Sequence, residues 1–154
     1  MPNKENKTIR ESRERFIEGM AQLLVPWGVP QTAARLYGYL LLSEGPVSLD
    51  RIVADLEISK STASVAARLL EMYTLARRSG QRGTRRVMFE ASDDFYGMLN
   101  AQKKSLEQLA ALMQGGAHST SSRRARERLR TMADFYLVNR NAMESAEREW
   151  AARK

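Results

Sequence analysis

The amphipathic segments 48–56 and 60–73 are separated by a link of only three residues. Ser48 and Ser59, whose hydroxyls can accept a hydrogen bond from a backbone N–H, stand at the two helix starts. Apolar residues recur in both segments at the three- and four-residue spacing of a helix. Because a link this short sets the second helix at a tight corner to the first, the sequence predicts a helix-turn-helix.

The second of these helices has an apolar side and a polar side. Val65, Leu69 and Met72 are expected to line its inner side, with Ala66 and Leu70 near them. A helix with a polar, basic outer side can enter the major groove of DNA, where its N-terminal residues reach base edges. The outer side supplies hydroxyls from Ser59, Ser61, Thr62 and Ser64 and charge from Lys60 and Arg68.

A basic hairpin is predicted directly after this helix. Two strand-like runs, 75–79 and 85–90, flank a Gly-bounded turn over 80–84. A hairpin in this position forms the wing of a winged helix. Arg82 at the tip, next to Gln81, suits insertion into a narrow minor groove. Contacts to phosphates, which position the protein without reading sequence, are expected from Arg77, Arg78, Arg85 and Arg86.

The positive charge of the chain is concentrated in this region. The whole sequence has 25 Lys and Arg against 18 Asp and Glu, a net charge of +7. Segment 58–86 holds seven of the cations and one acid, Glu71, so it carries +6 of that total. Charged faces that are merely solvated usually mix both signs. The concentration of one sign therefore predicts an anionic partner, with double-stranded DNA as the leading candidate.

The composition argues against an enzyme, a metal site or a cofactor site. Cysteine is absent from the sequence, so thiolate ligands, thiol nucleophiles and disulfides are excluded. The single histidine, His118, lies beside Ser119–Ser122 in a predicted loop without an acid to orient its ring. No apolar run reaches the length of a membrane span, and residues 1–15 lack the apolar core of a signal peptide. We therefore expect a cytoplasmic, nucleoid-associated protein without catalytic residues, metal, cofactor or membrane contact.

Long helices are predicted on both sides of the basic region. A first helix is expected to begin with a capping box at Thr8 and Glu11 and to end near Pro26. Residues 31–43 predict a buried second helix, and residues 93–113 predict a fifth helix followed by a flexible loop over 115–122. The boundaries expected from this reading are 1–27 for an N-terminal dimerisation helix, 28–92 for the DNA-binding domain and 93–154 for a C-terminal helical region.

The last predicted helix carries a heptad pattern. Leu129, Tyr136, Met143 and Trp150 stand seven residues apart, and Met132, Asn139 and Ala146 occupy the second seam position. Together with the stripe of the first helix, this seam predicts a homodimer. The expected dimer contacts are Phe16, Met20, Leu23, Leu129, Met132, Tyr136, Met143 and Trp150. The arginine-rich start of this helix, 123–130, is open to three interpretations: contact with DNA, pairing with acids of a partner subunit, or neither.

The set of motifs over about residues 10–115 resembles the MarR superfamily, in particular its GbsR-like branch. The resemblance rests on 28–42 (GVPQTAARLYGYLLL), 47–53 (VSLDRIV), 58–64 (ISKSTAS), 67–71 (ARLLE) and 75–78 (LARR). It implies a mainly α winged helix-turn-helix with long dimerisation helices, and a homodimeric transcriptional regulator that is often a repressor. Two positions differ from the pattern: Glu57 replaces the usual Gly before the turn, and Tyr73-Thr74 replaces the usual Leu-Gly after the recognition helix.

Two further hypotheses remain open from the sequence. Some relatives in this family respond to choline-like cations, which aromatic cages bind by cation–π attraction. A cage could be built from Phe16, Trp27, Tyr37, Tyr39 and Tyr96, although aromatic residues at helical spacing are usually core. Alternatively, the wing could serve an adaptor that binds RNA or another protein.

Overall fold

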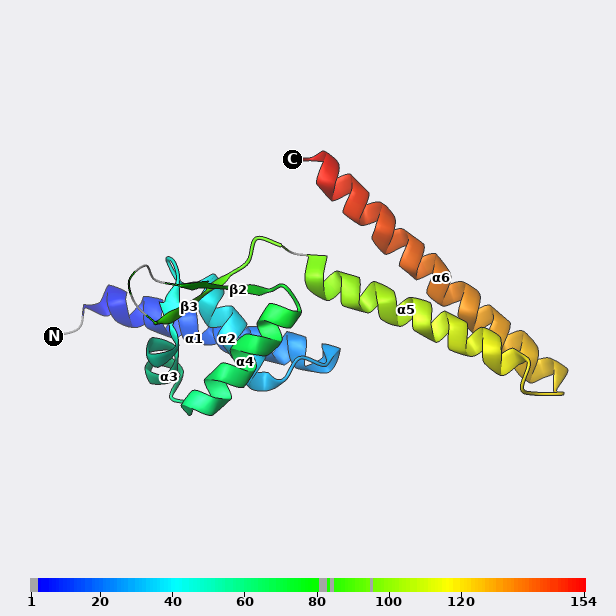
Figure 1. Cartoon of the computed structure of the whole chain (residues 1–154), viewed down its shortest axis with the longest axis horizontal. Coiled ribbons are helices and arrows are strands. Elements are labelled where there is room, and N and C mark those ends of the chain that lie inside the picture. The colour runs from blue at the N-terminus through cyan, green and yellow to red at the C-terminus, as the bar shows by residue number, and fades with distance from the viewer. Residues whose placement is uncertain (1–2, 81–82, 84, 95) are drawn as a thin grey trace. The chain divides into compact units, whose positions relative to one another are not determined.

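The computed structural model describes residues 3–80, 83, 85–94 and 96–154 (Figure 1). The chain divides into two units, Met1–Phe95 and Tyr96–Lys154. The second unit contains the helices α5 (Tyr96–Ala117) and α6 (Arg123–Ala152). The first unit contains α1 (Lys4–Leu24), the 3₁₀ helix η1 (Val25–Trp27), α2 (Gln31–Leu41), β1 (Val47–Ser48), α3 (Leu49–Leu56), α4 (Lys60–Met72), β2 (Ala76–Gly80) and β3 (Val87–Ala91).

Helix α1 begins earlier than the sequence predicted. Asn3 is its N-cap residue, and Thr8 lies inside the helix, where its hydroxyl donates to the carbonyl of Lys4 at 3.0 Å. The capping box at Thr8 and Glu11 is therefore wrong, because the backbone is already helical one turn upstream. The predicted end near Pro26 is confirmed, since α1 stops at Leu24 and Pro26 lies within η1.

Helix α2 forms the centre of the first unit. Ala34 and Leu36 are fully buried, and Leu40 is nearly so. Helix α1 packs closely on α2 at Gly38, where a Cβ atom would come within 3.2 Å of Met20 Cγ. Met20, which the sequence predicted at a dimer contact, thus packs against a helix of its own chain.

The helix-turn-helix has the predicted caps. The Ser48 hydroxyl accepts from the backbone N–H of Arg51 at 3.2 Å, and the Ser59 hydroxyl accepts from that of Thr62 at 3.1 Å. Glu57 and Thr74 adopt left-handed backbone angles, with φ of 54° and 58°. These are the two positions at which the resembled pattern has glycine, so the turns keep the geometry that glycine ordinarily supplies.

The buried side of α4 differs from the prediction. Its buried residues are Ala63, Ala66, Ala67 and Leu70. Val65 and Met72, predicted on the inner side, are 64% and 74% exposed. Helix α4 packs on α2, α3 and β2. Three of the four buried residues are alanines, and the larger Val65 and Met72 lie on the outer side.

The wing belongs to a three-stranded antiparallel sheet in the order β1-β3-β2. Strands β2 and β3 form the predicted hairpin, with Arg77 opposite Glu90 and Arg78 opposite Phe89. Strand β1 was not predicted, because two residues, Val47 and Ser48, are too few to show an alternating pattern. It pairs with β3 and joins the start of α3 to the base of the wing.

The second unit is an antiparallel pair of helices. Lys103 Nζ lies 3.2 Å from Glu147 Oε2, and Arg140 Nε lies 2.6 Å from Glu107 Oε1. Helix α5 continues to Ala117, so the flexible loop predicted over 115–122 is shorter, at 118–122. Gly116 lies close to α6, because a Cβ there would lie 3.4 Å from the Leu129 side chain. The fifth helix was expected to begin at residue 93, but residues 93 and 94 are not helical and α5 begins at Tyr96. Phe95, which was expected on its apolar side, lies outside the described residues.

The heptad seam of α6 is used within this helix pair. Tyr136 and Met143 precede Arg140 and Glu147 by four residues, so they share the helix side that bonds to α5. Leu129, Met132, Tyr136 and Met143 are accordingly half-buried in the single chain, whereas Trp150 is exposed. No helix in the described part of the chain combines the length and apolar composition needed to cross a membrane.

Candidate nucleic-acid interface

Successive turns of α4 each place one residue on its outward side, and together these residues form a row. Ser61, Val65, Arg68 and Met72 follow one another at spacings of four, three and four residues, and all four are exposed. Lys60 and Thr62 flank the row and are exposed as well, while Ser64 is half-buried. The structure therefore confirms an exposed polar surface on α4 but adds Val65 to its centre. Sequence analysis missed this residue because its apolar character favoured the core.

The hydroxyl groups of Ser59, Ser61 and Thr62, at the start of α4, make different hydrogen bonds. Ser59 Oγ caps the helix and also donates to Thr62 Oγ1 at 2.7 Å. This hydrogen bond commits the Ser59 proton and leaves the Thr62 proton free to donate outward. Ser61 Oγ lies 3.2 Å from Ser59 Oγ. Ser59 is thus chiefly a capping residue, and the exposed Ser61 and Thr62 are better placed to contact a ligand.

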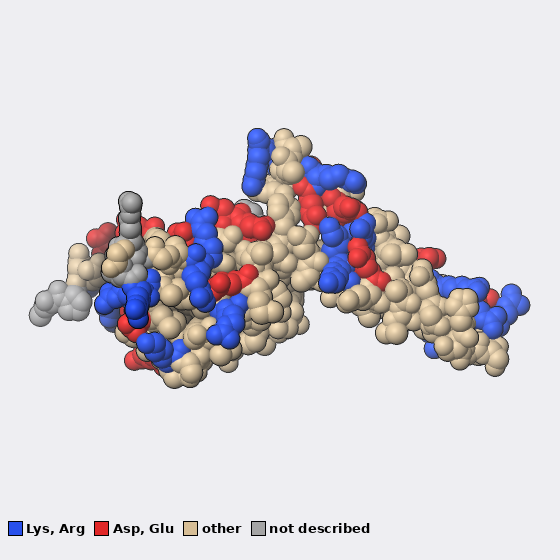
Figure 2. Space-filling view, in the orientation of Figure 1, with Lys and Arg blue, Asp and Glu red and all other residues tan. Residues whose placement is uncertain are grey.

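Two of the wing arginines are paired with acids. Arg77 Nε lies 2.7 Å from Glu90 Oε1, and Arg78 Nη2 lies 3.2 Å from Glu71 Oε1. The guanidinium of Arg78 also stacks over the Phe89 ring, 5.5 Å from its centroid. Figure 2 shows acidic side chains between the basic ones on this face of the first unit. Glu71 is already counted in the +6 of segment 58–86, so of these two acids it is Glu90 that lowers the charge excess when the chain folds.

A different set of basic residues converges at the base of the wing. Lys60, Arg85 and Arg86 line a pocket of about 370 Å³ together with Ser48, Leu49, Asp50 and Val87. Lys60 Nζ is 3.9 Å from Asp50 Oδ1, but both side chains are more than 70% exposed, so this ion pair is weak. Arg68 and Arg85 have no ion pair among the residues that the structure describes. The start of α4 and the wing thus place their cationic side chains around the same pocket. Gln81 and Arg82, predicted at the tip, lie outside the described residues.

Two of the three dimer contacts predicted on α1, Phe16 and Leu23, are exposed and form a stripe with Ile9, which was not predicted. Ile9, Phe16 and Leu23 stand seven residues apart and are 53%, 39% and 72% exposed. On the second unit, Leu112, Phe135 and Val138 are exposed by more than 60%. These apolar side chains are partly or largely exposed among the residues that the structure describes. The dimer itself remains a prediction.

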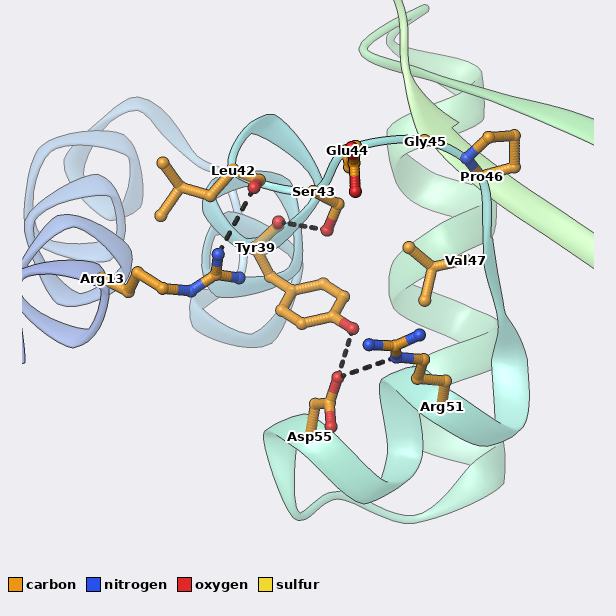
Figure 3. A pocket seen from close by; sticks show the side chains of 10 residues that line it. All are labelled: Arg13, Tyr39, Leu42, Ser43, Glu44, Gly45, Pro46, Val47, Arg51 and Asp55. Atoms are coloured by element: carbon orange, nitrogen blue, oxygen red, sulfur yellow. Dashed lines mark hydrogen bonds and ion pairs between the residues drawn. The ribbon is translucent and has the colours of Figure 1, made fainter. Parts of the chain in front are cut away.

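Of the aromatic residues predicted to form a cage, Tyr39 lines a cavity in the first unit. Tyr39 lines a cavity of about 530 Å³, and its hydroxyl donates to Asp55 Oδ2 at 2.5 Å (Figure 3). Burial, followed by the hydrogen bond and charge of Asp55, raises the pKa of Tyr39 to about 12. Phe16 and Trp27 are exposed, and Tyr96 belongs to the second unit. The cage for a choline-like cation stays a prediction.

No protein-family model matches the chain. Three curated proteins of Bacillus subtilis (strain 168) are similar in sequence. The putative HTH-type transcriptional regulator YvaV is 25% identical over 88 residues, which are 57% of this chain and 50% of the relative. The HTH-type transcriptional repressor GbsR is 26% identical over 94 residues, 61% and 52% of the two chains. The HTH-type transcriptional repressor OpcR is 24% identical over 88 residues, 57% and 48%. The chain spans about half the length of these relatives.

A solved structure described as "Crystal Structure of a transcriptional regulator" has the same fold. It superposes with a TM-score of 0.78 at 22% sequence identity and covers 92% of this chain and 99% of its own. The comparison confirms the predicted fold class, a mainly helical winged helix-turn-helix with a small antiparallel sheet. The predicted resemblance to GbsR-like regulators is confirmed as well, since the similar curated proteins are HTH-type transcriptional regulators and include GbsR itself.

Proposed function

We propose that the chain is a transcriptional regulator that binds double-stranded DNA in a sequence-specific manner. The observation that carries the proposal is the convergence of Lys60 from α4 with Arg85 and Arg86 from the wing at one pocket. A groove-binding helix needs cations on the flanking phosphates, because phosphate contacts set its register on the duplex. Similarity to HTH-type regulators supports the same conclusion.

In this proposal α4 lies in the major groove. Ser61 and Val65 face the base edges from successive turns, while Lys60, Thr62 and Arg68 contact the phosphates. The major groove is about 12 Å wide and admits one helix. Arg85 and Arg86 hold the backbone beside the wing, and Arg82 is proposed to reach the minor groove. Arg77 and Arg78 contribute less than their sequence positions indicate, because Glu90 and Glu71 already pair with them.

The regulator is proposed to act as a homodimer. Ile9, Phe16 and Leu23 form an exposed seven-residue repeat on α1, and the helix pair of the second unit exposes Phe135 and Val138. Uncovered apolar stripes of this kind are typical of dimer interfaces. Two subunits would read half-sites about one helical turn, roughly 10 base pairs, apart. We further propose repression as the outcome, as the names of GbsR and OpcR state for those proteins, with the nucleoid in the cytoplasm as the place of action.

The test is DNA binding across a salt series, with a site selected from a random duplex pool. If Lys60, Arg68 and Arg85 of both subunits each neutralise one phosphate, log K should fall with log salt at a slope of about −5. Arg68→Gln should weaken binding and flatten the slope, whereas Arg10→Gln, on exposed α1, should leave both unchanged. A flat salt dependence would refute the proposal. Equal binding to an RNA duplex of the same sequence would favour the adaptor hypothesis, because the deep, narrow major groove of RNA does not admit α4.

A further inference from the structure

Positive charge is concentrated where α5 joins α6. Segment 118–130, the loop and the first two turns of α6, contains five arginines and one acid, Glu127. The rest of the second unit has six cations and five acids. Figure 2 shows basic side chains gathered at this end of the helix pair and mixed signs toward the C-terminal end of α6. The arginine cluster, as we call it, consists of Arg123, Arg124, Arg126, Arg128 and Arg130.

Elsewhere in the second unit, basic side chains pair with acids of the facing helix. Lys103 Nζ lies 3.2 Å from Glu147 Oε2, and Arg140 Nε lies 2.6 Å from Glu107 Oε1. The last acid on α5 is Glu107, ten residues before the helix ends, so α5 offers no acid near the cluster. The excess charge of the cluster is therefore not balanced across the helix pair.

Two members of the cluster have partners nearby. Arg123 Nε lies 3.0 Å from Glu127 Oε1, and Arg126 Nη2 donates to the carbonyl of Thr120 at 3.1 Å. The exposed members without an ion pair or hydrogen bond among the described residues are Arg124, Arg128 and Arg130.

The position of these arginines does not stabilise α6. Arg124 and Arg128 are four residues apart, so their like charges are neighbours on one side of the helix and repel each other. Cations in the first turn also oppose the helix macrodipole, whose N-terminal end is positive. Residues that break local rules in this way are characteristic of functional sites. A bound anion would relieve both repulsions.

The surface around the cluster is polar. No large apolar side chain is exposed between residues 113 and 134, all of which the structure describes. Protein interfaces depend on apolar and aromatic side chains at their centre. Arginines and hydroxyl groups are instead the usual contacts to the phosphates of a duplex, and Ser119, Ser121 and Ser122 are exposed beside the arginines. The surface therefore fits a phosphodiester backbone better than a protein.

We propose that the arginine cluster binds the phosphate backbone of double-stranded DNA without reading its sequence. Arg124, Arg128 and Arg130 each neutralise one phosphate, because a guanidinium matches phosphate with paired hydrogen bonds. This surface belongs to the second unit, whereas α4 and the wing belong to the first. If both units hold one duplex, the second contact becomes intramolecular and raises the overall affinity. That consequence alone rests on the proposed function.

The test is binding of the full chain to a labelled duplex of scrambled sequence, measured by fluorescence anisotropy across a salt series. Arg124→Gln/Arg128→Gln should make the slope of log K against log salt shallower by about two units per subunit. Affinity at low salt should fall by about tenfold or more. The matched control is Arg148→Gln/Arg153→Gln, which removes two exposed charges near the other end of α6 and should change neither quantity. No loss in the cluster variant, or an equal loss in the control, would overturn the proposal.

Thermal unfolding separates binding from a structural role. Because the two like charges repel, Arg124→Gln/Arg128→Gln should unfold at the same temperature as the unmodified chain or at a higher one. A lower unfolding temperature with unchanged duplex binding would mean that the arginines support α6 instead of binding DNA.

A photo-crosslinker locates the contact without removing an arginine. The sequence has no cysteine, so Ser121→Cys provides a single attachment point at an exposed position beside the cluster, and Ala151→Cys provides one near the other end of α6. On irradiation with the scrambled duplex, Ser121→Cys should crosslink to DNA several-fold more than Ala151→Cys. Equal crosslinking, or none from Ser121→Cys, would contradict the proposal.

Two further probes distinguish the alternatives. Polyglutamate represents an acidic protein: if the cluster variant loses polyglutamate binding but keeps duplex binding, the partner is a protein and the proposal is wrong. The site selected from a random pool tests the proposed function, and the cluster variant should lose the same factor on the selected and scrambled duplexes. Absence of preference for the selected site refutes the proposed function and keeps the cluster contact. Preference for that site with unchanged affinity in the cluster variant does the reverse.

Discussion

Arg77 and Glu90 face each other across the strands β2 and β3, with 2.7 Å between Arg77 Nε and Glu90 Oε1. The pair places an acid inside the most basic part of the chain. It lowers the positive charge that the wing presents and holds the guanidinium of Arg77 along the sheet. Glu90 therefore limits the electrostatic attraction of the wing to a polyanion.

Replacing Glu90 with glutamine should strengthen DNA binding. The change removes one negative charge per wing and frees Arg77 for a phosphate, so the salt slope should steepen by up to about two units per dimer. Affinity at low salt should rise by about tenfold. Thermal stability should fall only slightly, because ion pairs at an exposed surface contribute little to the free energy of unfolding. The measurement is the same salt series that tests the proposed function.

The control for Glu90→Gln is Glu149→Gln. Glu149 pairs with Arg153 at 2.9 Å near the C-terminal end of α6, and its replacement changes the net charge equally. We expect little change in DNA affinity from this variant. An equal gain in both variants would mean that overall charge, rather than the pair at the wing, controls binding.

Val65 should read a thymine methyl group. It is 64% exposed at the centre of the outward row of α4, where an apolar side chain can contact the C5 methyl in the major groove. Replacing thymines of the selected site with deoxyuridine, one at a time, should weaken binding at one position by about 1 kcal/mol. In Val65→Ala the same replacement should have a much smaller effect. Arg68→Gln serves as the control, because it should weaken binding yet keep the sensitivity to deoxyuridine.

Glycine at position 74 should stabilise the protein. Thr74 has φ of 58°, an angle that is unfavourable for a β-branched residue. The backbone N–H of Leu75 donates to the carbonyl of Leu70 at 2.9 Å across this turn, which keeps Thr74 in place. Thr74→Gly should raise the free energy of unfolding by about 0.5–1 kcal/mol, measured by urea denaturation. Thr131→Gly, in exposed helical backbone of α6, should instead lower it by a few tenths of a kcal/mol.

The two helical glycines of the first unit should respond differently to alanine. Gly19 on α1 has no atom within 4 Å of the new Cβ, so Gly19→Ala should stabilise by about 0.5–1 kcal/mol. At Gly38 on α2 the Cβ would lie 3.3 Å from Ile17 Cα. Because that atom belongs to the α1 backbone, Gly38→Ala should lose this gain through overpacking. The measurement is the thermal unfolding temperature of the two variants. Equal stabilisation by Gly19→Ala and Gly38→Ala would contradict the close contact of α1 with α2.

Stability should depend on Tyr39 at high pH. Its pKa in the fold is raised to about 12 from 10.0, chiefly by burial and then by Asp55. A raised pKa means that the fold favours the protonated hydroxyl, so this stabilisation is complete below pH 10 and is lost as pH approaches 12. Urea unfolding between these values should show a smaller decline for Tyr39→Phe than for the unmodified chain. Identical declines would show that Tyr39 does not titrate in this window.

Short-range signals predicted the helix-turn-helix correctly. Ser48 and Ser59 precede their helices and accept hydrogen bonds from the third residue on, a contact that lies within one turn. Pro26 likewise ended α1 where expected. Such features depend on neighbouring residues alone, so the amino-acid order is sufficient to locate them. The hairpin with its arginines also follows from local period and turn residues.

Packing between distant segments decides which side of α4 is exposed. Helical spacing allowed either Val65 and Met72 or the row Ala63, Ala66 and Ala67 to face inward. The folded chain buries the alanines on the side of α4 that packs against the rest of the first unit. The effective charge of the wing has the same origin, since Glu90 neutralises Arg77 only after β3 folds back along β2. Faces and ion pairs between distant segments thus required the folded chain, whereas caps and turns were already encoded in adjacent residues.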